Sequence, residues 1–175
     1  MKTEESTGAK KIVETERLVL REMTTADAPL MLALLNEPAF IDFVADRGVR
    51  TTQQAAAYIA EKILPSYAQF GFGFYVVEVK ESGTPIGMCG LIKRETMDDV
   101  DIGFSILERY WGHGYATEAA AAVMKYALTT HRLSRVVAVT APENFRSMAV
   151  LEKIGLRFEK MITLPGYGFE SRLFT

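Results

Sequence analysis

Several residue types that carry specialised chemistry are scarce in this chain of 175 residues. It contains one cysteine, Cys89, and two histidines, His113 and His131, that lie far apart in the sequence. A disulfide needs two cysteines, and a structural zinc site usually needs four nitrogen or sulfur ligands at characteristic spacings. The sequence therefore excludes an internal disulfide and predicts no metal site, and we expect Cys89 to be a small apolar residue of the core.

The chain also lacks an excess of one charge and a long apolar run. It has 20 basic and 22 acidic residues, a net charge of −2 and a pI of about 5.8, so no overall field attracts the phosphate backbone of a nucleic acid. No stretch reaches the roughly 18 apolar residues of a membrane-spanning helix, and the opening MKTEESTGAKK lacks the apolar centre of a signal peptide. We expect a cytoplasmic protein with no nucleic-acid partner and no membrane partner.

The composition that is present indicates a folded domain of mixed secondary structure. Hydrophobic residues make up 49% of the chain and charged residues 24%, enough for one domain with a sizeable core. The apolar residues switch between helical and strand spacing, which predicts a mixed α/β fold of the α+β class with the element order βααβββαβαββ. We expect the polar segment 1–11 to be a flexible tail and residues 12–175 to form a single domain.

Two helices are predicted after the first strand, RLVLREM. Thr24 or Thr25 is suited to cap the first helix, whose leucines form one apolar stripe. The threonine pair at 51–52 is suited to cap the second helix, which Pro65 should bend and Gly71 should end.

Three strand-like runs follow these helices. FGFYVVEV and PIGMCGLIKR are joined by KESGT, whose serine and glycine favour a turn, so the two runs should pair as a hairpin. The third run is VDIGFSIL, whose alternation places apolar side chains on one face and Asp101, Gly103 and Ser105 on the other. A small and polar face suits either an ordinary half-solvated strand or the wall of a cleft.

Two glycines stand where this strand turns into an alanine-rich helix, in RYWGHGYATEAAAA. Gly112 and Gly114 lack Cβ atoms, so consecutive backbone N–H groups can point at one anion such as a phosphate. The loop lacks the Gly-Lys-Ser/Thr of a Walker loop, and Thr117 stands where a dinucleotide fingerprint has its third glycine. A tight turn from strand to helix also needs glycine for its own conformation, so the loop alone leaves both interpretations open.

A segment after the next strand, APENFRSMAVLEKIGL, completes a set of three ordered motifs. Together with ETERLVLREMTTAD and WGHGYATEA, this set resembles the GNAT superfamily of acyl-CoA-dependent N-acetyltransferases, whose phosphate loop reads Gln/Arg-x-x-Gly-x-Gly/Ala. This chain has Arg109, Gly112 and Gly114 at the three defined positions. The resemblance is greatest to the branch of ribosomal-protein alanine acetyltransferases (RimJ/RimL) and covers the chain from Ile12. It implies a mostly antiparallel sheet that is flanked by helices and splayed open between its fourth and fifth strands.

The resemblance implies acetyl-CoA as the cosubstrate, bound in this splay. Its pyrophosphate is expected on the backbone amides from Gly112 to Thr117, and its pantetheine arm beside the fourth strand and the last motif. The implied coenzyme contacts are Ile106, Leu107, Arg109, Gly112, His113, Gly114, Tyr115, Ala116, Thr117, Asn144 and Ser147. Asn144 and Ser147 are also suited to the start of the helix that follows, a role that is compatible with coenzyme binding.

The resemblance also implies two catalytic residues. Asp101 aligns with the fourth-strand carboxylate that serves as base in several members, directly or through water, because the acceptor amine must lose its extra proton. A backbone N–H near Ile106 is expected to stabilise the oxyanion. Many members have a tyrosine as general acid where this chain has Leu151, so Ser147 is expected to take that role here. The alternatives are Tyr110, Tyr115 and Tyr167, or no general acid at all, because a coenzyme thiol is acidic enough to leave with little help.

The acceptor is expected to be a primary amine, either a protein N-terminus or a small molecule. In this family the segment between the first two helices, here AFIDFVAD, builds the acceptor pocket, so Phe40, Phe43 and Asp46 are implied acceptor contacts. We expect a monomer or a homodimer. The alternative function is a catalytically silent acyl-CoA-binding module, which the missing tyrosine favours, whereas Asp101 and Ser147 favour the enzyme. A third interpretation, a nucleotide-binding domain, is excluded because the loop lacks the Walker lysine.

Overall fold

One sheet of eight strands runs through the molecule. The computed structural model describes residues 8–175, and the strands follow the order β1-β2-β3-β4-β5-β6-β8-β7 across the sheet. Neighbouring strands are antiparallel, except that β5 and β6 are parallel. The strands are β1 (Lys11–Glu14), β2 (Leu18–Glu22), β3 (Phe74–Val79), β4 (Thr84–Ile92), β5 (Val100–Ile106), β6 (Val136–Thr140), β7 (Phe158–Thr163) and β8 (Glu170–Phe174).

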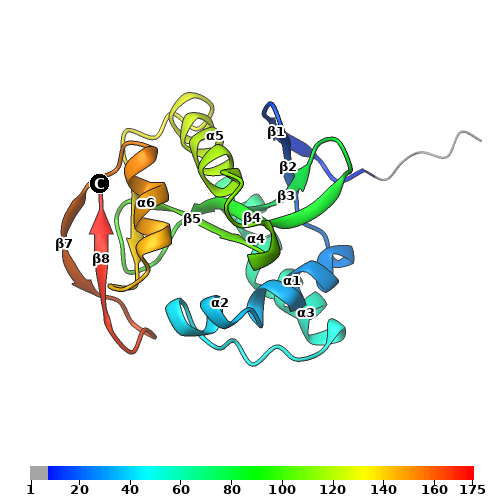
Figure 1. The fold of residues 1–175 in the computed structure, drawn as a ribbon, viewed down its shortest axis with the longest axis horizontal. Coiled ribbons are helices and arrows are strands. Elements are labelled where there is room, and N and C mark those ends of the chain that lie inside the picture. Colours follow the sequence, from blue (N-terminus) through cyan, green and yellow to red (C-terminus); the bar gives the residue numbers. More distant parts are fainter. Residues whose placement is uncertain (1–7) are drawn as a thin grey trace, which may run out of the picture.

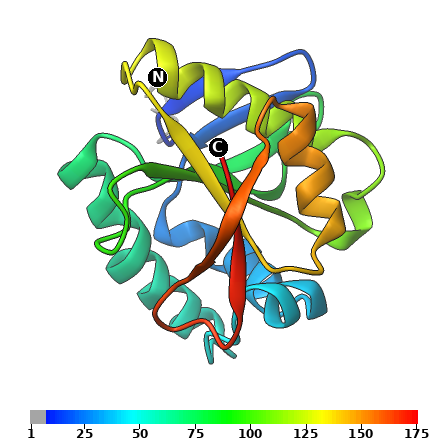
Figure 2. The same cartoon turned by 90° about the vertical axis from the view of Figure 1, so that its left-hand side faces the viewer.

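Helices cover both faces of this sheet. Figure 1 shows α5 and α6 on one side and α1, α2 and α3 on the other, and Figure 2 shows the molecule turned by 90°. The helices are α1 (Ala28–Leu35), α2 (Pro38–Phe43), α3 (Thr52–Tyr58), α4 (Leu64–Phe70), α5 (Tyr115–Thr129) and α6 (Phe145–Lys153). This layered arrangement confirms the α+β fold that the sequence predicts.

Each helical layer packs on its own apolar core. α5 packs against β4 and β5 through small buried residues, which allow the helix to approach the sheet closely. These residues are Ala119, Ala120, Val123 and Ala127. On the other face, Met31 and Leu34 of α1 belong to a cluster with Val76 of β3 and Met88 of β4. Cys89 is fully buried in the α5 core, as expected for a small apolar residue.

The parallel pair near the centre of the sheet is short. Within the described chain, β5 and β6 are paired at Val100↔Val136 and Asp101↔Val137 and nowhere else. From residue 102 to 106, β5 remains paired with β4 but has no strand partner on its other side. The sheet is therefore splayed open between these two strands, as the sequence predicts, and the splay begins directly after Asp101.

Two short elements are missing from the predicted order. β1 has four residues, too few to show an alternation, and its register with β2 is irregular. α2 has six residues and buries only Phe40, so it shows no helical stripe. Near Pro65, where the sequence predicts a bend, the structure has a π-helical segment, Ile59–Ile63, that precedes α4. A proline lacks the N–H donor and clashes with the carbonyl four residues earlier, which favours such a local change of helix type.

The N-terminal segment is described only from Gly8. The predicted tail, 1–11, therefore lies mostly outside the described residues, and its last residue, Lys11, begins β1. In the part of the chain that the structure describes, no helix is both long enough and apolar enough to cross a membrane.

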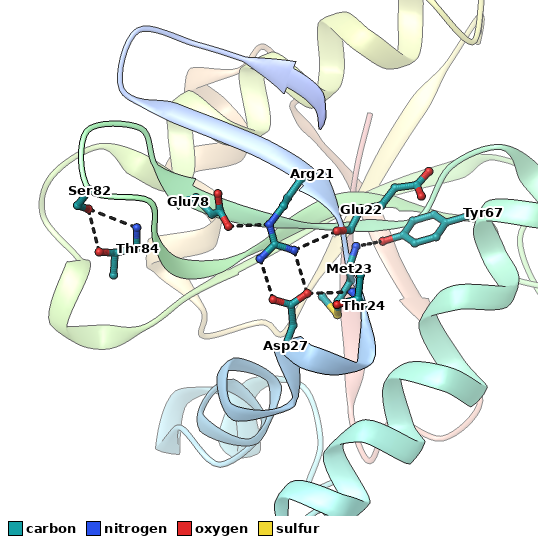
Figure 3. Close-up of polar contacts among 9 residues, drawn as sticks. All are labelled: Arg21, Glu22, Met23, Thr24, Asp27, Tyr67, Glu78, Ser82 and Thr84. Atoms are coloured by element: carbon teal, nitrogen blue, oxygen red, sulfur yellow. Dashed lines mark hydrogen bonds and ion pairs between the residues drawn. The ribbon is translucent and has the colours of Figure 1, made fainter. Parts of the chain in front are cut away.

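A buried ion pair fixes the start of α1 to the sheet (Figure 3). Arg21 of β2 donates two hydrogen bonds to Asp27, at 2.8 and 2.9 Å, and its Nε donates to Glu78 of β3 at 2.6 Å. Asp27 also accepts the backbone N–H of Thr24 at 2.9 Å, and Thr24 occupies the N-cap position of the 3-10 turn, Thr25–Asp27, that leads into α1. The Asp27 side chain is 9% exposed, so each of these hydrogen bonds replaces a hydrogen bond to water that the carboxylate loses on burial. The cluster holds β2, β3 and the first helix in one arrangement.

We predict that Asp27→Ala lowers the free energy of unfolding by about 3 kcal/mol, the lower end of the cost of breaking a buried ion pair, because Arg21 keeps its contact with Glu78. Urea denaturation measures this change. The matched control is Asp46→Ala, which removes the exposed ion pair with Arg50 and should cost far less. Equal losses in the two variants would contradict the role of the buried pair.

Candidate active site

Two cavities meet in the splay of the sheet. The loop cavity, with a volume of about 410 Å³, lies between the glycine loop that precedes α5 and one face of α6. The carboxylate cavity, with a volume of about 230 Å³, contains Asp101 and extends between α2, β5 and β6. The residues that line both are Phe40, Phe43, Val44, Phe104, Ser105, Asn144 and Ser147. A molecule in one cavity can therefore reach a molecule in the other.

The glycine loop presents free backbone donors to the loop cavity. Gly112 and Gly114 have φ values of +80° and +79°, a conformation that strongly favours glycine. The first helical hydrogen bond of α5 runs from the Glu118 N–H to the Gly114 carbonyl at 3.0 Å. The N–H groups of the segment 115–117 therefore have no partner within the helix, and these three residues line the cavity. This geometry is that of an anion site at a helix N-terminus.

Three residues that the sequence analysis missed support this loop. The guanidinium of Arg17 donates to the His113 carbonyl at 2.8 Å and to Glu118 at 2.7 Å, and it lies 4.7 Å from the centre of the Tyr115 ring. Glu118 also accepts the hydroxyl of Thr15 at 2.6 Å. Burial alone raises the pKa of Glu118, but the hydrogen bonds from Thr15 and Arg17 outweigh burial and lower it. The loop is thus held from the segment between β1 and β2.

Most of the predicted coenzyme contacts line the loop cavity. They are Ile106, Gly112, Gly114, Tyr115, Ala116, Thr117, Asn144 and Ser147. Arg109 and His113 line neither cavity, and their coenzyme contacts stay predictions. Leu107 is 2% exposed and also lines neither cavity, and its coenzyme contact stays a prediction. Its N–H donates to Ile86 and its carbonyl accepts from Tyr110, both at 2.9 Å, so both backbone groups already have partners.

The backbone of Ile106 faces the splay. Because the Leu107 N–H points to β4, the alternation of an antiparallel ladder directs the N–H of Ile106 to the opposite side, into the splay. The Ile106 carbonyl accepts the indole N–H of Trp111 at 2.7 Å. Trp111 is therefore a packed residue of the loop that also lines the cavity.

Two positive side chains on α6 were not anticipated. Arg146 and Lys153 line the loop cavity together with Ala149 and Val150, at the spacing of one helical face. Arg146 also lies over the Trp111 ring, 4.6 Å from its centre. The sequence shows the helical spacing of these residues, but it does not show that this face of α6 lies opposite the glycine loop.

Asp101 is the buried carboxylate of the second cavity. Its side chain is 2% exposed, and its Oδ2 accepts from the Nε of Arg94 at 2.8 Å. Its Oδ1 has no hydrogen-bond partner among residues 8–175. Burial raises the pKa of Asp101 to about 6, although the positive charge and hydrogen bond of Arg94 act in the opposite direction. One oxygen of a weakly acidic carboxyl group is therefore available to a bound molecule.

Arg94 connects Asp101 to the loop between β7 and β8. Its Nη1 donates to the hydroxyl of Tyr167 at 3.2 Å, and all three side chains line the carboxylate cavity. Sequence analysis did not select Arg94, although Ile92 pairs with Asp101 in the β4–β5 ladder and Arg94 follows two residues later. The hairpin register was the signal that could have identified it.

Asn144 and Ser147 stand at the junction of the cavities. Asn144 Oδ1 accepts the Ser147 N–H at 3.2 Å, which confirms the predicted helix cap. Leu151, one turn after Ser147, is 1% exposed and lines the carboxylate cavity.

The other candidate side chains lie farther from this junction. Tyr110 and Tyr115 line only the loop cavity, whereas Tyr167 lines only the carboxylate cavity. Phe40 and Phe43 line both cavities, as their proposed acceptor role requires. Asp46 is exposed, pairs with Arg50 and lines neither cavity, and its acceptor contact stays a prediction.

No group of three or more histidine, cysteine, aspartate or glutamate side chains is arranged to hold a metal ion among residues 8–175. The polar groups around the cavities are backbone N–H groups, hydroxyls, the Asn144 amide, arginines, one lysine and one carboxylate.

Comparisons with known proteins agree with this geometry. The protein YkkB of Bacillus subtilis (strain 168) is 29% identical over 158 residues, which are 89% of this chain and 90% of that protein. The crystal structure of an acetyltransferase from Agrobacterium tumefaciens str. C58 has a TM-score of 0.76 and 26% identity, and the match covers 99% of this chain and 98% of that one.

A ribosomal L7/L12 alpha-N-protein acetyltransferase, RimL, in complex with coenzyme A has a TM-score of 0.79 at 17% identity. That match covers 94% of this chain and 96% of RimL, and at this identity it shows a shared fold. Residues 17–157 match the family described as the acetyltransferase (GNAT) domain. The chain belongs to the GNAT acetyltransferase family.

Proposed function

We propose that this protein transfers the acetyl group of acetyl-CoA directly to a primary amine, on a protein N-terminus or a small molecule. GNAT acetyltransferases use acetyl-CoA as the acetyl donor. The observation that carries the proposal is the junction of two cavities, one with an anion-binding loop and the other with a buried carboxylate. In this proposal, residues 12–175 act as one catalytic domain.

The loop cavity offers groups that complement the coenzyme. Its pyrophosphate is suited to the N–H groups of segment 115–117, and Arg146 and Lys153 add positive charge on the opposite wall. The unpaired edge of β5 is suited to the amides of the pantetheine arm, as in the addition of a strand to a sheet. The thioester end then reaches the junction at Ser105 and Ser147.

The carboxylate cavity offers a base for the acceptor. An α-amine has a pKa of roughly 7.7 to 8.0 and a lysine amine roughly 10.4, so most of either is protonated at neutral pH. Asp101, with a pKa near 6, is largely ionised at pH 7 and binds a proton more strongly than an ordinary aspartate. In our proposal its Oδ1 takes the amine proton, either directly or through one water.

Acetyl transfer then proceeds by addition and elimination. The amine nitrogen attacks the carbonyl carbon of the thioester, and the resulting oxyanion accepts a hydrogen bond from the Ile106 N–H. The carbon–sulfur bond breaks, and its electron pair leaves on the sulfur. Ser147 is proposed to donate a hydrogen bond to this thiolate, since Leu151 has no polar group. The alternative is a catalytically silent module, in which the same residues bind acyl-CoA but no acetyl group is transferred.

The proposal is tested by measuring the release of coenzyme A thiol in the presence of acetyl-CoA and a panel of amines. The panel includes N-terminal peptides of ribosomal proteins, amino acids, polyamines and aminoglycosides. Acetylation of at least one amine, confirmed by mass spectrometry of the product, is the expected result. Tight coenzyme binding without acetylation of any amine would favour the silent module.

We predict that Gly114→Val weakens acetyl-CoA binding at least tenfold, because the new side chain distorts a left-handed residue of the anion site, and its Cβ would lie 3.4 Å from Arg17. Isothermal titration calorimetry measures the Kd. Gly83→Val is the matched control, since Gly83 also has a positive φ, +67°, but lies in the turn between β3 and β4. The loop assignment would be wrong if both folded variants bound acetyl-CoA like the wild type.

We predict that Asp101→Asn lowers kcat/KM about 100-fold at pH 7, the lower end of general-base effects, while leaving the side-chain shape unchanged. In the wild type, protonation of Asp101 below about pH 6 should reduce activity. In the variant this acid limb should disappear, and activity should partly recover at high pH, where the amine loses its own proton. Asp99→Asn is the control, because Asp99 lies two residues earlier and lines neither cavity. An unchanged pH profile in Asp101→Asn would remove its role as base.

We predict that Ser147→Ala lowers kcat about fivefold with little change in the Kd of acetyl-CoA, since a hydrogen bond to sulfur matters as negative charge develops. Steady-state kinetics, calorimetry and a thermal melt on one preparation separate this effect from a loss of stability. Tyr115→Phe and Tyr167→Phe are the comparison variants. A normal kcat in Ser147→Ala together with a reduced kcat in either tyrosine variant would transfer the role to that tyrosine.

A further inference from the structure

An exposed arginine that the proposed chemistry does not use lines the carboxylate cavity. Arg47, in the segment between α2 and α3, lines this cavity, and no hydrogen bond or ion pair joins it to another of the residues 8–175. Arg94 lines the same cavity, and Asp101 is the only carboxylate among the lining residues. The wall therefore carries more positive than negative charge.

A second arginine in the same segment, Arg50, differs from Arg47 because it has a counter-ion. Arg50, three residues later, donates to Asp46 at 2.6 Å and to Asn36 at 2.9 Å, so its charge is already satisfied. The acidic residue of the segment thus neutralises the arginine outside the cavity and leaves the arginine at the cavity without a counter-ion.

We propose that the acceptor is a small primary amine that also carries an anionic group, with its amine at Asp101 and its anionic group at Arg47. This inference rests on the proposed acetyltransferase function and narrows its acceptor. A carboxylate and a phosphonate have the same kind of complementarity to a guanidinium, which binds planar or tetrahedral oxyanions through paired N–H donors.

The surroundings of Arg47 support this arrangement. Burial raises the pKa of the Tyr58 phenol, the charge of Arg47 opposes that rise, and Tyr167 adds to it. Arg47, Tyr58 and Tyr167 therefore lie close enough to interact electrostatically, and Tyr167 in turn bonds Arg94 beside Asp101. Arg47, Tyr58, Tyr167 and Arg94 all contribute polar groups to the cavity that contains Asp101.

The rest of the cavity fits a compact acceptor with an apolar body. Phe40, Phe43, Val44, Phe74 and Met88 provide the apolar lining. The volume of about 230 Å³ lies below the range of roughly 300–1,000 Å³ that is typical of ligand pockets. A peptide N-terminus would present an amide where a free amino acid presents its carboxylate, and it would leave Arg47 without a partner.

The test compares matched acceptors in the wild type and in Arg47→Gln. The acceptors are L-phenylalanine, L-leucine and L-methionine, their carboxamides, the corresponding phosphonic acid of leucine, and N-terminal ribosomal-protein peptides. In the wild type, kcat/KM for the best acid should exceed that for its amide. Arg47→Gln should raise the KM for the acid about tenfold with a small change in kcat, and should leave the kinetics of the amide unchanged.

Controls separate charge recognition from general damage. Arg47→Lys should restore part of the selectivity, because lysine keeps the charge but loses the planar fork. Lys62→Gln removes the positive charge of an exposed residue that lines neither cavity, and it should leave the kinetic constants for both the acid and the amide unchanged. Higher salt should reduce the advantage of the acid over the amide in the wild type.

The outcomes distinguish this inference from the proposed function. Acetyl transfer to neutral amines or peptides at least as fast as to acids would contradict the proposal of an acceptor with an anionic group. An equal loss of kcat/KM for acids and amides in Arg47→Gln would also contradict it. Neither result would contradict the proposed acetyltransferase function. Failure of the wild type to acetylate any amine would overturn both. Preference for the phosphonic acid over the carboxylic acid would support the inference and identify the anionic group.

Discussion

The parallel pairing of β5 with β6 stops after Asp101, and the rest of the site depends on that interruption. If the ladder continued, the backbone of β5 from residue 102 to 106 would be fully hydrogen-bonded, and the two cavities would be filled by strand. Because it stops, the side of β5 that faces the splay has unused backbone groups inside a folded sheet, a place where unsatisfied groups are costly unless a ligand or water meets them. The same break places the last paired residue, Asp101, at the inner end of the opening.

The charge of Asp101 is balanced by opposing effects. Burial favours the neutral carboxyl group, whereas Arg94 favours the carboxylate, and the pKa of about 6 reflects both. The single hydrogen bond from Arg94 engages one oxygen and leaves the other free. A second donor to Asp101 would stabilise the carboxylate further and make it a weaker base. The incomplete pairing is therefore consistent with a group that has to exchange a proton.

The sequence predicted those parts of the site that are local along the chain. The glycine loop, the Asn144 cap and the face of β5 that carries Asp101 each follow from residues a few positions apart. The structure was needed for contacts between distant segments, such as Arg17 with the loop and Arg94 with Asp101. The hydrogen bonds of the Leu107 backbone to Ile86 and Tyr110 also required the structure, because sequence alternation gives the direction of a side chain but not the partners of its backbone. In the fold, the elements that were missed are the ones too short to show a period, β1 and α2.

The contact between Arg17 and the glycine loop makes the N-terminal hairpin a part of the structure that supports the loop cavity. The segment between β1 and β2 supports the loop through Thr15 and Arg17, which are about one hundred positions away from Glu118 in the sequence. A substitution in either segment therefore affects the support of the loop, even though neither Thr15 nor Arg17 lines a cavity. A hybrid enzyme could take β1 and β2 from one relative and the glycine loop from another. The two segments would then not have been selected to contact each other, and the loop would lose the hydrogen bonds that hold its geometry.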